Sequence, residues 1–183
     1  CYAGSKILDM VRDEGLRRER VRMVLGAAGG PKWLVLYGLD RVLCREWLPT
    51  GTTPLDCLGA SIGAWRFAAY CQPDPGDALD RFLEAYRRQS YSMAPTPAEV
   101  SRVLGGVLHS FVDADAAREI AAQQNRRLHI VTVRGRVLLN AEASPLVGLG
   151  LAGASLVNSV RPQGLRWFFE RTIFSHPQSP LAG

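Results

Sequence analysis

Two glycine-bearing loops, each set between a short apolar run and a helical pattern, constrain the fold of this chain most. The first follows the β-like run 21–25 and the second follows a strand at 55–58. The run 62–71, after the second loop, is apolar almost all round. The stretch 32–48, after the first loop, carries apolar residues at helical spacing, namely Leu36, Leu39, Leu43 and Trp47. This strand–helix–strand–helix order predicts a right-handed βαβ unit in an α/β fold with a mainly parallel sheet.

The rest of the chain continues the same alternation. Helical periodicity covers 77–90 and 97–112, and a third helix begins at an aspartate cap, Asp113 or Asp115. A strand is predicted over 128–133 because β-branched valines recur there. With no internal repeat or linker, we expect a single domain over residues 1–183.

Composition and charge exclude several classes of protein. A chain with 47% apolar and 21% charged residues is neither disordered nor collagen-like. The net charge of +5 is too small to indicate a nucleic-acid partner, although it is compatible with an anionic lipid surface. Residues 143–160 carry no charge, but their glycine, proline and polar residues predict a buried helix instead of a membrane span. We therefore expect a cytoplasmic protein, with membrane contact at most peripheral.

The four cysteines predict neither a disulfide framework nor a metal site. They are scattered, without a CxxC pair, and Cys57 and Cys71 lie in apolar runs, which is typical of buried free thiols. The chain begins with Cys1 and not with methionine, so we expect a fragment, a processed form or an incomplete protein. The arginines at 17–22 are interpreted as a solvated face beside Glu14 and Glu19, with a basic lipid anchor as the alternative.

The second loop has the pattern of a nucleophile elbow. It reads Gly59-Ala60-Ser61-Ile62-Gly63, and a G-x-S-x-G between a strand and a helix places the serine on a strained turn. The small residues at Gly59 and Gly63 would let the helix approach the strand closely. The alternative is a glycine-padded turn in which Ser61 caps the helix.

The first loop, Gly26-Ala-Ala-Gly-Gly-Pro-Lys32, is suited to binding an oxyanion. Its small residues leave backbone N–H groups unshielded, and Pro31 opens a helix. A phosphate-binding P-loop would need glycine at Pro31 and serine or threonine at Trp33, and neither loop has the dinucleotide pattern G-x-G-x-x-G. The alternative is a glycine-rich left-handed turn.

These two motifs, about 30 residues apart, resemble those of the patatin-like phospholipases, over roughly residues 21–71. The resemblance implies a three-layer α/β/α sandwich that uses a Ser–Asp dyad on lipid acyl esters, with no metal or organic cofactor. Ser61 then resembles the nucleophile and Lys32 the basic residue of the loop. The oxyanion donors would be Ala28, Gly29 and Gly30.

The chain departs from the family in lacking any Asp-Gly pair, the motif that carries the family's aspartate. Its five aspartates after Ser61 fit caps or solvent-facing positions, so we expect the domain to be C-terminally incomplete and the base to lie beyond the chain end. A serine without its base is a weak nucleophile, so residues 1–183 alone should be nearly inactive.

Three other functions remain open from the sequence. A histidine triad of α/β-hydrolase type would have to use the late His176, although a satisfied histidine is the expected role there and at His129. A non-catalytic lipid-binding or regulatory relative would keep the pocket without the chemistry. An acyltransferase of serine-elbow type usually has a histidine at the position of Ala60.

Overall fold

The computed structural model describes residues 4–136, 155, 159 and 162–179. The chain divides into two compact units, Cys1–His129 with Ser175–Gly183, and Ile130–Phe174. Both predicted motifs lie in the first unit. The helix expected over 143–160 falls outside the described residues, apart from Ser155 and Ser159.

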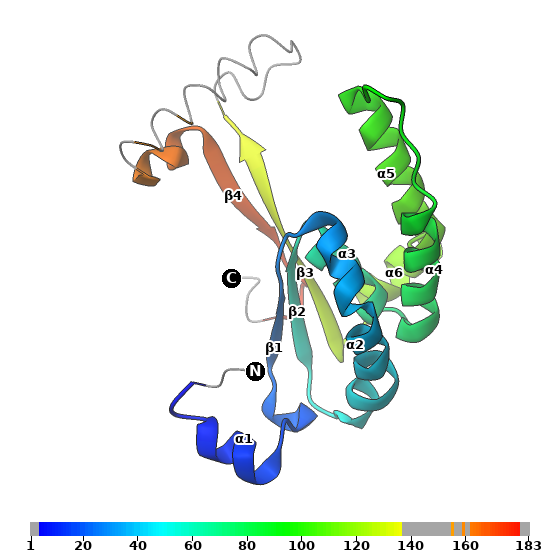
Figure 1. Ribbon diagram of the computed structural model, residues 1–183. Helices are drawn as coiled ribbons and strands as arrows, with labels where there is room; N and C mark the ends of the chain where they lie inside the picture. The colour runs from blue at the N-terminus through cyan, green and yellow to red at the C-terminus, as the bar shows by residue number, and fades with distance from the viewer. Residues whose placement is uncertain (1–3, 137–154, 156–158, 160–161, 180–183) are drawn as a thin grey trace. The chain divides into compact units, whose positions relative to one another are not determined.

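A four-stranded sheet gives the molecule its α/β character (Figure 1). The strands follow chain order across the sheet: β1 (Met23–Gly26), β2 (Leu55–Ala60), β3 (Arg126–Gly135) and β4 (Phe169–Phe174). β1 and β2 pair in parallel, with Gly26 opposite Gly59, whereas β3 and β4 pair antiparallel. The Leu55 N–H donates to the Asn125 carbonyl at 2.8 Å, so the first residues of β2 and β3 lie side by side. The predicted α/β fold with a mainly parallel sheet is confirmed.

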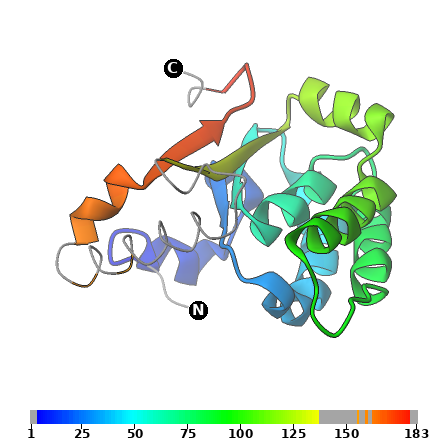
Figure 2. The ribbon, with the colours of Figure 1, turned by 90° about the horizontal axis from the view of Figure 1, so that it is seen from above.

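Helices α2 to α6 lie on one side of β1 and β2 (Figures 1 and 2). They form one covering layer of the expected α/β/α sandwich. The helices are α1 (Leu8–Glu14), α2 (Tyr37–Val42), α3 (Ile62–Tyr70), α4 (Pro75–Arg87), α5 (Pro97–Phe111) and α6 (Ala114–Ala122). Short helical turns are η1 (Arg18–Arg20), η2 (Gly30–Leu36), η3 (Leu43–Trp47), η4 (Leu48–Thr50) and η6 (Pro162–Trp167).

Side-chain caps begin three of the predicted helices, and the first is Asp74, whose carboxylate accepts from the Asp77 N–H at 2.9 Å and caps α4. The Asp113 carboxylate accepts from the backbone N–H groups of Asp115 and Ala116, so Asp113, not Asp115, caps α6. The Thr96 hydroxyl accepts from the N–H of Glu99 at 3.2 Å and caps α5. These contacts satisfy amide groups that the first helical turn leaves without an intrahelical partner.

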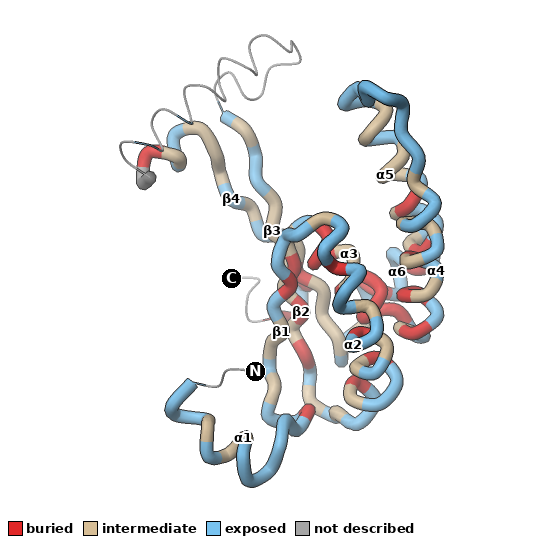
Figure 3. Tube along the Cα trace, in the orientation of Figure 1, coloured by how far each residue is buried: buried red, intermediate tan, exposed pale blue. Residues whose placement is uncertain are grey.

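The core fills the space between β2 and the helical layer (Figure 3). The Trp33 ring stacks on Phe82 with centroids 4.4 Å apart, and Phe82 stacks in turn on Phe111 at 4.6 Å. Cys57 and Cys71 are fully buried free thiols, as predicted. Their mutual hydrogen bond and their burial raise the pKa of the Cys57 thiol well above its usual value, so it stays protonated.

Arginine 18 is structural, which rules it out of a lipid anchor. It is 2% exposed and donates to the Val21 and Thr53 carbonyls at 3.1 and 2.8 Å. Burial lowers the pKa of its guanidinium, since charge is disfavoured away from water. Arg17 and Arg20 lie beside Glu14, in agreement with the expected solvated face. Among the described residues, no helix combines the length and the apolar character needed to cross a bilayer.

The helix predicted over 32–48 is the element that differs most from expectation. It is a composite of η2, α2, η3 and η4, and two residues of its predicted apolar row are exposed, Leu36 by 38% and Leu39 by 55%. The buried row contains Trp33, Asp40 and Cys44. Hydrophobic spacing therefore located the helix but misplaced its inward face.

A buried ion pair explains why the helical segment after the first loop buries a different face from the one predicted. Asp40 on α2 is 0% exposed and accepts from Arg66 Nε and from the Tyr70 hydroxyl, each at 2.7 Å. Burial alone would lower the pKa of Arg66, but the hydrogen bond and the charge of Asp40 outweigh burial and raise it. The pair joins α2 to α3, because both cationic and phenolic donors come from α3.

Removing the charge of Asp40 should therefore destabilise the folded protein. We expect Asp40→Asn to lower the free energy of unfolding by about 3 to 5 kcal/mol, because Arg66 would keep a buried charge without its counter-ion. Urea denaturation followed by circular dichroism measures this change. The matched control is Glu84→Gln, which breaks an exposed ion pair with Arg88 and should leave the midpoint unchanged. Equal effects of the two substitutions would show that the buried pair does not fix α2.

Candidate active site

Ser61 lies on a strained turn between β2 and α3. Its φ of 51° and ψ of −127° make it the one non-glycine residue with a positive φ among the described residues. Its side chain makes no hydrogen bond to the first turn of α3, so the alternative of a capping serine is wrong. The residue is exposed although its neighbours Ile62 and Gly63 are buried. A strained, exposed serine at the N-terminus of a helix has the geometry of a nucleophile elbow.

Backbone contact brings the two loops side by side. A Cβ at Gly63 would overlap the carbonyl group of Gly26, at the end of β1, and would lie 2.9 Å from the Ala27 carbonyl oxygen. A Cβ at Gly59 would overlap the backbone of Ala64 in α3. The first turn of α3 therefore packs directly on the carboxyl ends of β1 and β2, which is the juxtaposition that the two motifs predict.

The first loop leaves three amides without an acceptor. Among the described residues, the N–H groups of Ala28, Gly29 and Gly30 donate no hydrogen bond. Gly30 has a φ of 52°, so the loop does contain the left-handed glycine turn that was the alternative to an oxyanion-binding loop. The Lys32 N–H donates to the Gly29 carbonyl at 3.3 Å and closes the start of η2. The loop is thus a tight turn whose remaining N–H groups are available to an anionic oxygen.

Lys32 and Trp33, which follow the first loop, have different roles. The Lys32 side chain is exposed and has no ion pair in the described part of the chain. Trp33 is 2% exposed and holds the loop by stacking on Phe82. The large residue at position 33 therefore anchors η2 to the core without entering the site.

None of the aspartates after Ser61 is hydrogen-bonded to its side chain within the described part of the chain. Two of these aspartates are caps, Asp74 for α4 and Asp113 for α6. The other three form ion pairs with nearby arginines, namely Asp77 with Arg81, Asp80 with Arg41, and Asp115 with Arg118. This agrees with the expected cap and solvent-facing roles.

The late histidines are satisfied structural residues, as expected. His129 is fully buried, with Nε2 3.0 Å from the Asp56 carboxylate and Nδ1 accepting from the His176 N–H at 3.4 Å. The His176 ring nitrogen Nε2 lies 2.9 Å from the Ala121 carbonyl. Asp56 is five residues before Ser61, about 16 Å along an extended strand, so this cluster belongs to the opposite strand end. A triad through His176 therefore has no support in the geometry.

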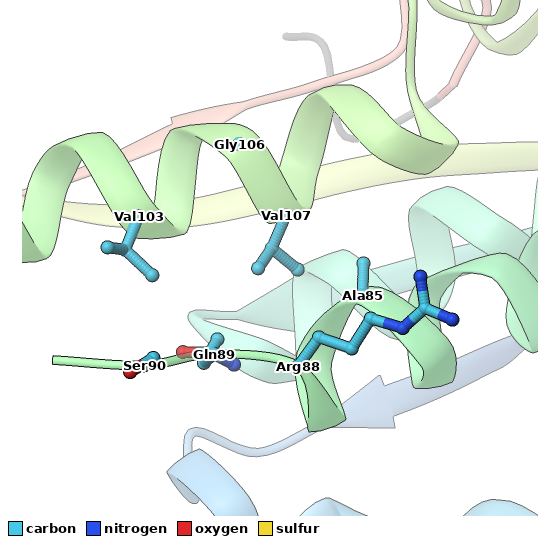
Figure 4. A pocket seen from close by; sticks show the side chains of 7 residues that line it. All are labelled: Ala85, Arg88, Gln89, Ser90, Val103, Gly106 and Val107. Atoms are coloured by element: carbon cyan, nitrogen blue, oxygen red, sulfur yellow. The ribbon is translucent and has the colours of Figure 1, made fainter.

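The aromatic residues near the two loops belong to the hydrophobic core. Phe67 and Tyr70 are each 3% exposed. A hollow of about 330 Å³ lies elsewhere, between α4 and α5, where Val103 and Val107 point toward Ala85 (Figure 4). None of the residues predicted for the site lines it.

Sequence reasoning missed the clamp formed by Asp40, Arg66 and Tyr70. It connects the helices that follow the two loops, and burial with the adjacent carboxylate raises the pKa of the Tyr70 hydroxyl, which stays protonated as a donor. A signal was present in the sequence: Arg66 is the one charge in an apolar helix, and Asp40 interrupts an apolar stretch. A lone buried charge requires a partner of opposite sign.

The close approach of α3 to β1 is testable through stability. We expect Gly63→Ala to lower the free energy of unfolding by about 3 kcal/mol, because a methyl group would be forced into the backbone of Gly26. The control is Gly38→Ala on α2, where an added Cβ meets nothing within 4 Å, so helix propensity should slightly raise stability. If Gly63→Ala were as stable as the wild type in urea denaturation, the loops would not be in contact.

The strain at Ser61 gives a second stability prediction. Because glycine adopts positive φ freely, Ser61→Gly should raise the free energy of unfolding by about 1 kcal/mol. Ser61→Ala should leave it nearly unchanged, since no capping hydrogen bond is lost. A loss of about 1 kcal/mol in Ser61→Ala, the usual cost of removing a helix cap, would contradict this geometry. Thermal and urea denaturation of both variants make the comparison.

Comparison of the chain with family models, with curated proteins and with solved structures found no match. The resemblance to patatin-like phospholipases therefore depends on the residues of the two loops alone. The structure adds local geometry, namely a strained serine, three amides that have no acceptor within the described part of the chain, and a backbone contact that joins the two loops.

Proposed function

We propose that this chain carries the nucleophile and oxyanion loop of a serine acyl hydrolase that acts on lipid esters. The observation that carries the proposal is the backbone contact between the Ser61 turn and the loop whose amides, at Ala28, Gly29 and Gly30, find no acceptor among the residues that the structure describes. Hydrolysis of an ester requires a nucleophile and donors for the negative charge that develops on the carbonyl oxygen. The two loops supply these two requirements from neighbouring positions.

The proposed reaction has two steps. In the first, the Ser61 oxygen attacks the ester carbonyl carbon as its proton passes to a base, and the loop amides stabilise the resulting oxyanion. Collapse of this intermediate breaks the bond to the alcohol, which leaves with a proton, and an acyl group remains on Ser61. In the second step, water attacks the acyl-enzyme, the acid is released and the serine recovers its proton. The lipid character of the ester comes from the resemblance to the patatin-like family.

The general base is the part of the site that we propose to lie outside the chain's described residues. The resemblance implies an aspartate in an Asp-Gly-Gly or Asp-Gly-Ala motif, and the five aspartates after Ser61 are engaged as caps or in ion pairs. The competing function is a lipid-binding relative without catalysis. The replacement of loop glycine by alanine at positions 27 and 28 favours that alternative.

A fluorophosphonate probe tests the proposal directly. We expect residues 1–183 to label weakly and to hydrolyse a short nitrophenyl ester near the background rate, because Ser61 lacks a base. In a longer chain that includes a downstream Asp-Gly motif, labelling and hydrolysis should be strong, and both should be lost in Ser61→Ala.

The two forms of the chain give distinct contradicting outcomes. If residues 1–183 labelled strongly at Ser61, a base would already be present and the proposed location of the aspartate would be wrong. If the longer chain folded but showed no labelling that depends on Ser61, the hydrolase would be excluded in favour of the non-catalytic relative.

A further inference from the structure

Lys32 gives the loop that precedes it a positive charge without a counter-ion. Its side chain is exposed and forms no ion pair within the described part of the chain. A Cβ placed on Gly29 would lie 3.9 Å from the Lys32 Cβ, so the lysine side chain begins beside the loop amides. The sequence has two lysines, and Lys32 is the one that follows either of the two loops.

The chain around both loops contains no carboxylate. No aspartate or glutamate occurs in residues 20–39 or in residues 57–73, which hold the two loops and the segments that flank them. Arg66 lies in the second of these segments, but its charge is neutralised by the buried carboxylate of Asp40. The charge of Lys32 is therefore not balanced by its neighbours in sequence.

Carboxylates on neighbouring elements do not offset this charge. Asp80 of α4 is paired with Arg41, so this exposed pair has no net charge. Glu19 precedes β1 and Asp56 lies at the start of β2, whereas both loops follow the ends of these strands. Glu46 is exposed about 20 Å further along the helical segment than the lysine, which exceeds the Debye length of about 8 Å at physiological salt.

We propose that Lys32 makes the site selective for esters that carry an anionic group, a phosphate or a carboxylate, close to the scissile carbonyl. This inference rests on the proposed function, because it concerns the substrate of that site. The loop amides stabilise charge that develops during the reaction, whereas a lysine attracts charge that the substrate already carries. Its flexible four-carbon stem lets the ammonium group follow an anion whose position differs between substrates. Lys32 is thus a specificity-determining residue.

The charge felt at position 61 can be measured without catalysis. In Cys1→Ser/Ser61→Cys the introduced thiol is accessible, whereas Cys44, Cys57 and Cys71 are buried. Two methanethiosulfonate reagents, one with a sulfonate and one with a trimethylammonium group, modify a thiolate by the same exchange reaction. The ratio of the sulfonate rate to the ammonium rate should fall by about threefold to tenfold when Lys32→Gln is added. Any effect of Lys32 on the thiolate itself cancels in this ratio.

The matched control for the thiol measurement is Lys6→Gln. Lys6 is exposed and precedes α1, which comes before the start of β1, so its removal should leave the ratio unchanged. Sodium chloride at about 1 M should bring the ratio with Lys32 present close to the ratio in Lys32→Gln, because salt screens the charge. The inference is overturned if Lys32→Gln and Lys6→Gln give the same ratio.

Hydrolysis by the longer chain separates this inference from the proposed function. Nitrophenyl hemisuccinate should have a higher kcat/KM than nitrophenyl butyrate, or a short-chain phosphatidate a higher value than the matching diacylglycerol. The first preference would place the anion on the acyl side of the ester, and the second on the alcohol side. Lys32→Gln should remove the preference. Hydrolysis that depends on Ser61 but shows no preference for either anionic ester, or keeps its preference in Lys32→Gln, overturns the role of Lys32 alone. Absence of such hydrolysis overturns the proposed function as well.

Discussion

Direct packing of backbone on backbone, where the first turn of α3 meets the ends of β1 and β2, is the constraint on which the candidate site depends. Glycine at positions 26, 59 and 63 allows this approach, since a Cβ at any of them would meet atoms of the facing segment. The approach also forces the chain to turn sharply at Ser61, which accounts for its positive φ. Strain at the serine and proximity of the two loops thus have one cause.

A second constraint acts between helices α2 and α3. The buried Asp40 carboxylate holds α2 against α3 through two donors of α3, so the helices that follow the two loops are joined by charge as well as by apolar contact. Such a pair contributes mainly geometry, because desolvation of two charges offsets most of their attraction. Its effect here is to fix the rotation of α2, which leaves Val35 and Leu39 facing outward.

Backbone packing therefore fixes the two turns that carry Ser61 and the loop amides, whereas the rest of the proposed site would depend on side chains from distant segments. The proposed nucleophile and oxyanion donors come from two turns of one βαβ unit, and both turns are held by local packing. In the proposed reaction the base would come from a segment distant in sequence. The pair of His129 with Asp56 is at the other end of β2 and stabilises the start of the sheet.

The sequence by itself determined the approximate positions of β1 to β3 and of α3 to α6, narrowed the cap of α6 to Asp113 or Asp115, and located the two turns at 26–30 and 59–63. These features follow from local rules: apolar periodicity, capping chemistry and the small size of glycine. Only the tertiary structure decided which side of α2 faces the core, that Ser61 is free of any capping bond, and that Arg18 and Asp40 are buried. Each of these depends on a partner far along the chain, such as Arg66 for Asp40 and the Thr53 carbonyl for Arg18, and residue spacing carries no information about such partners.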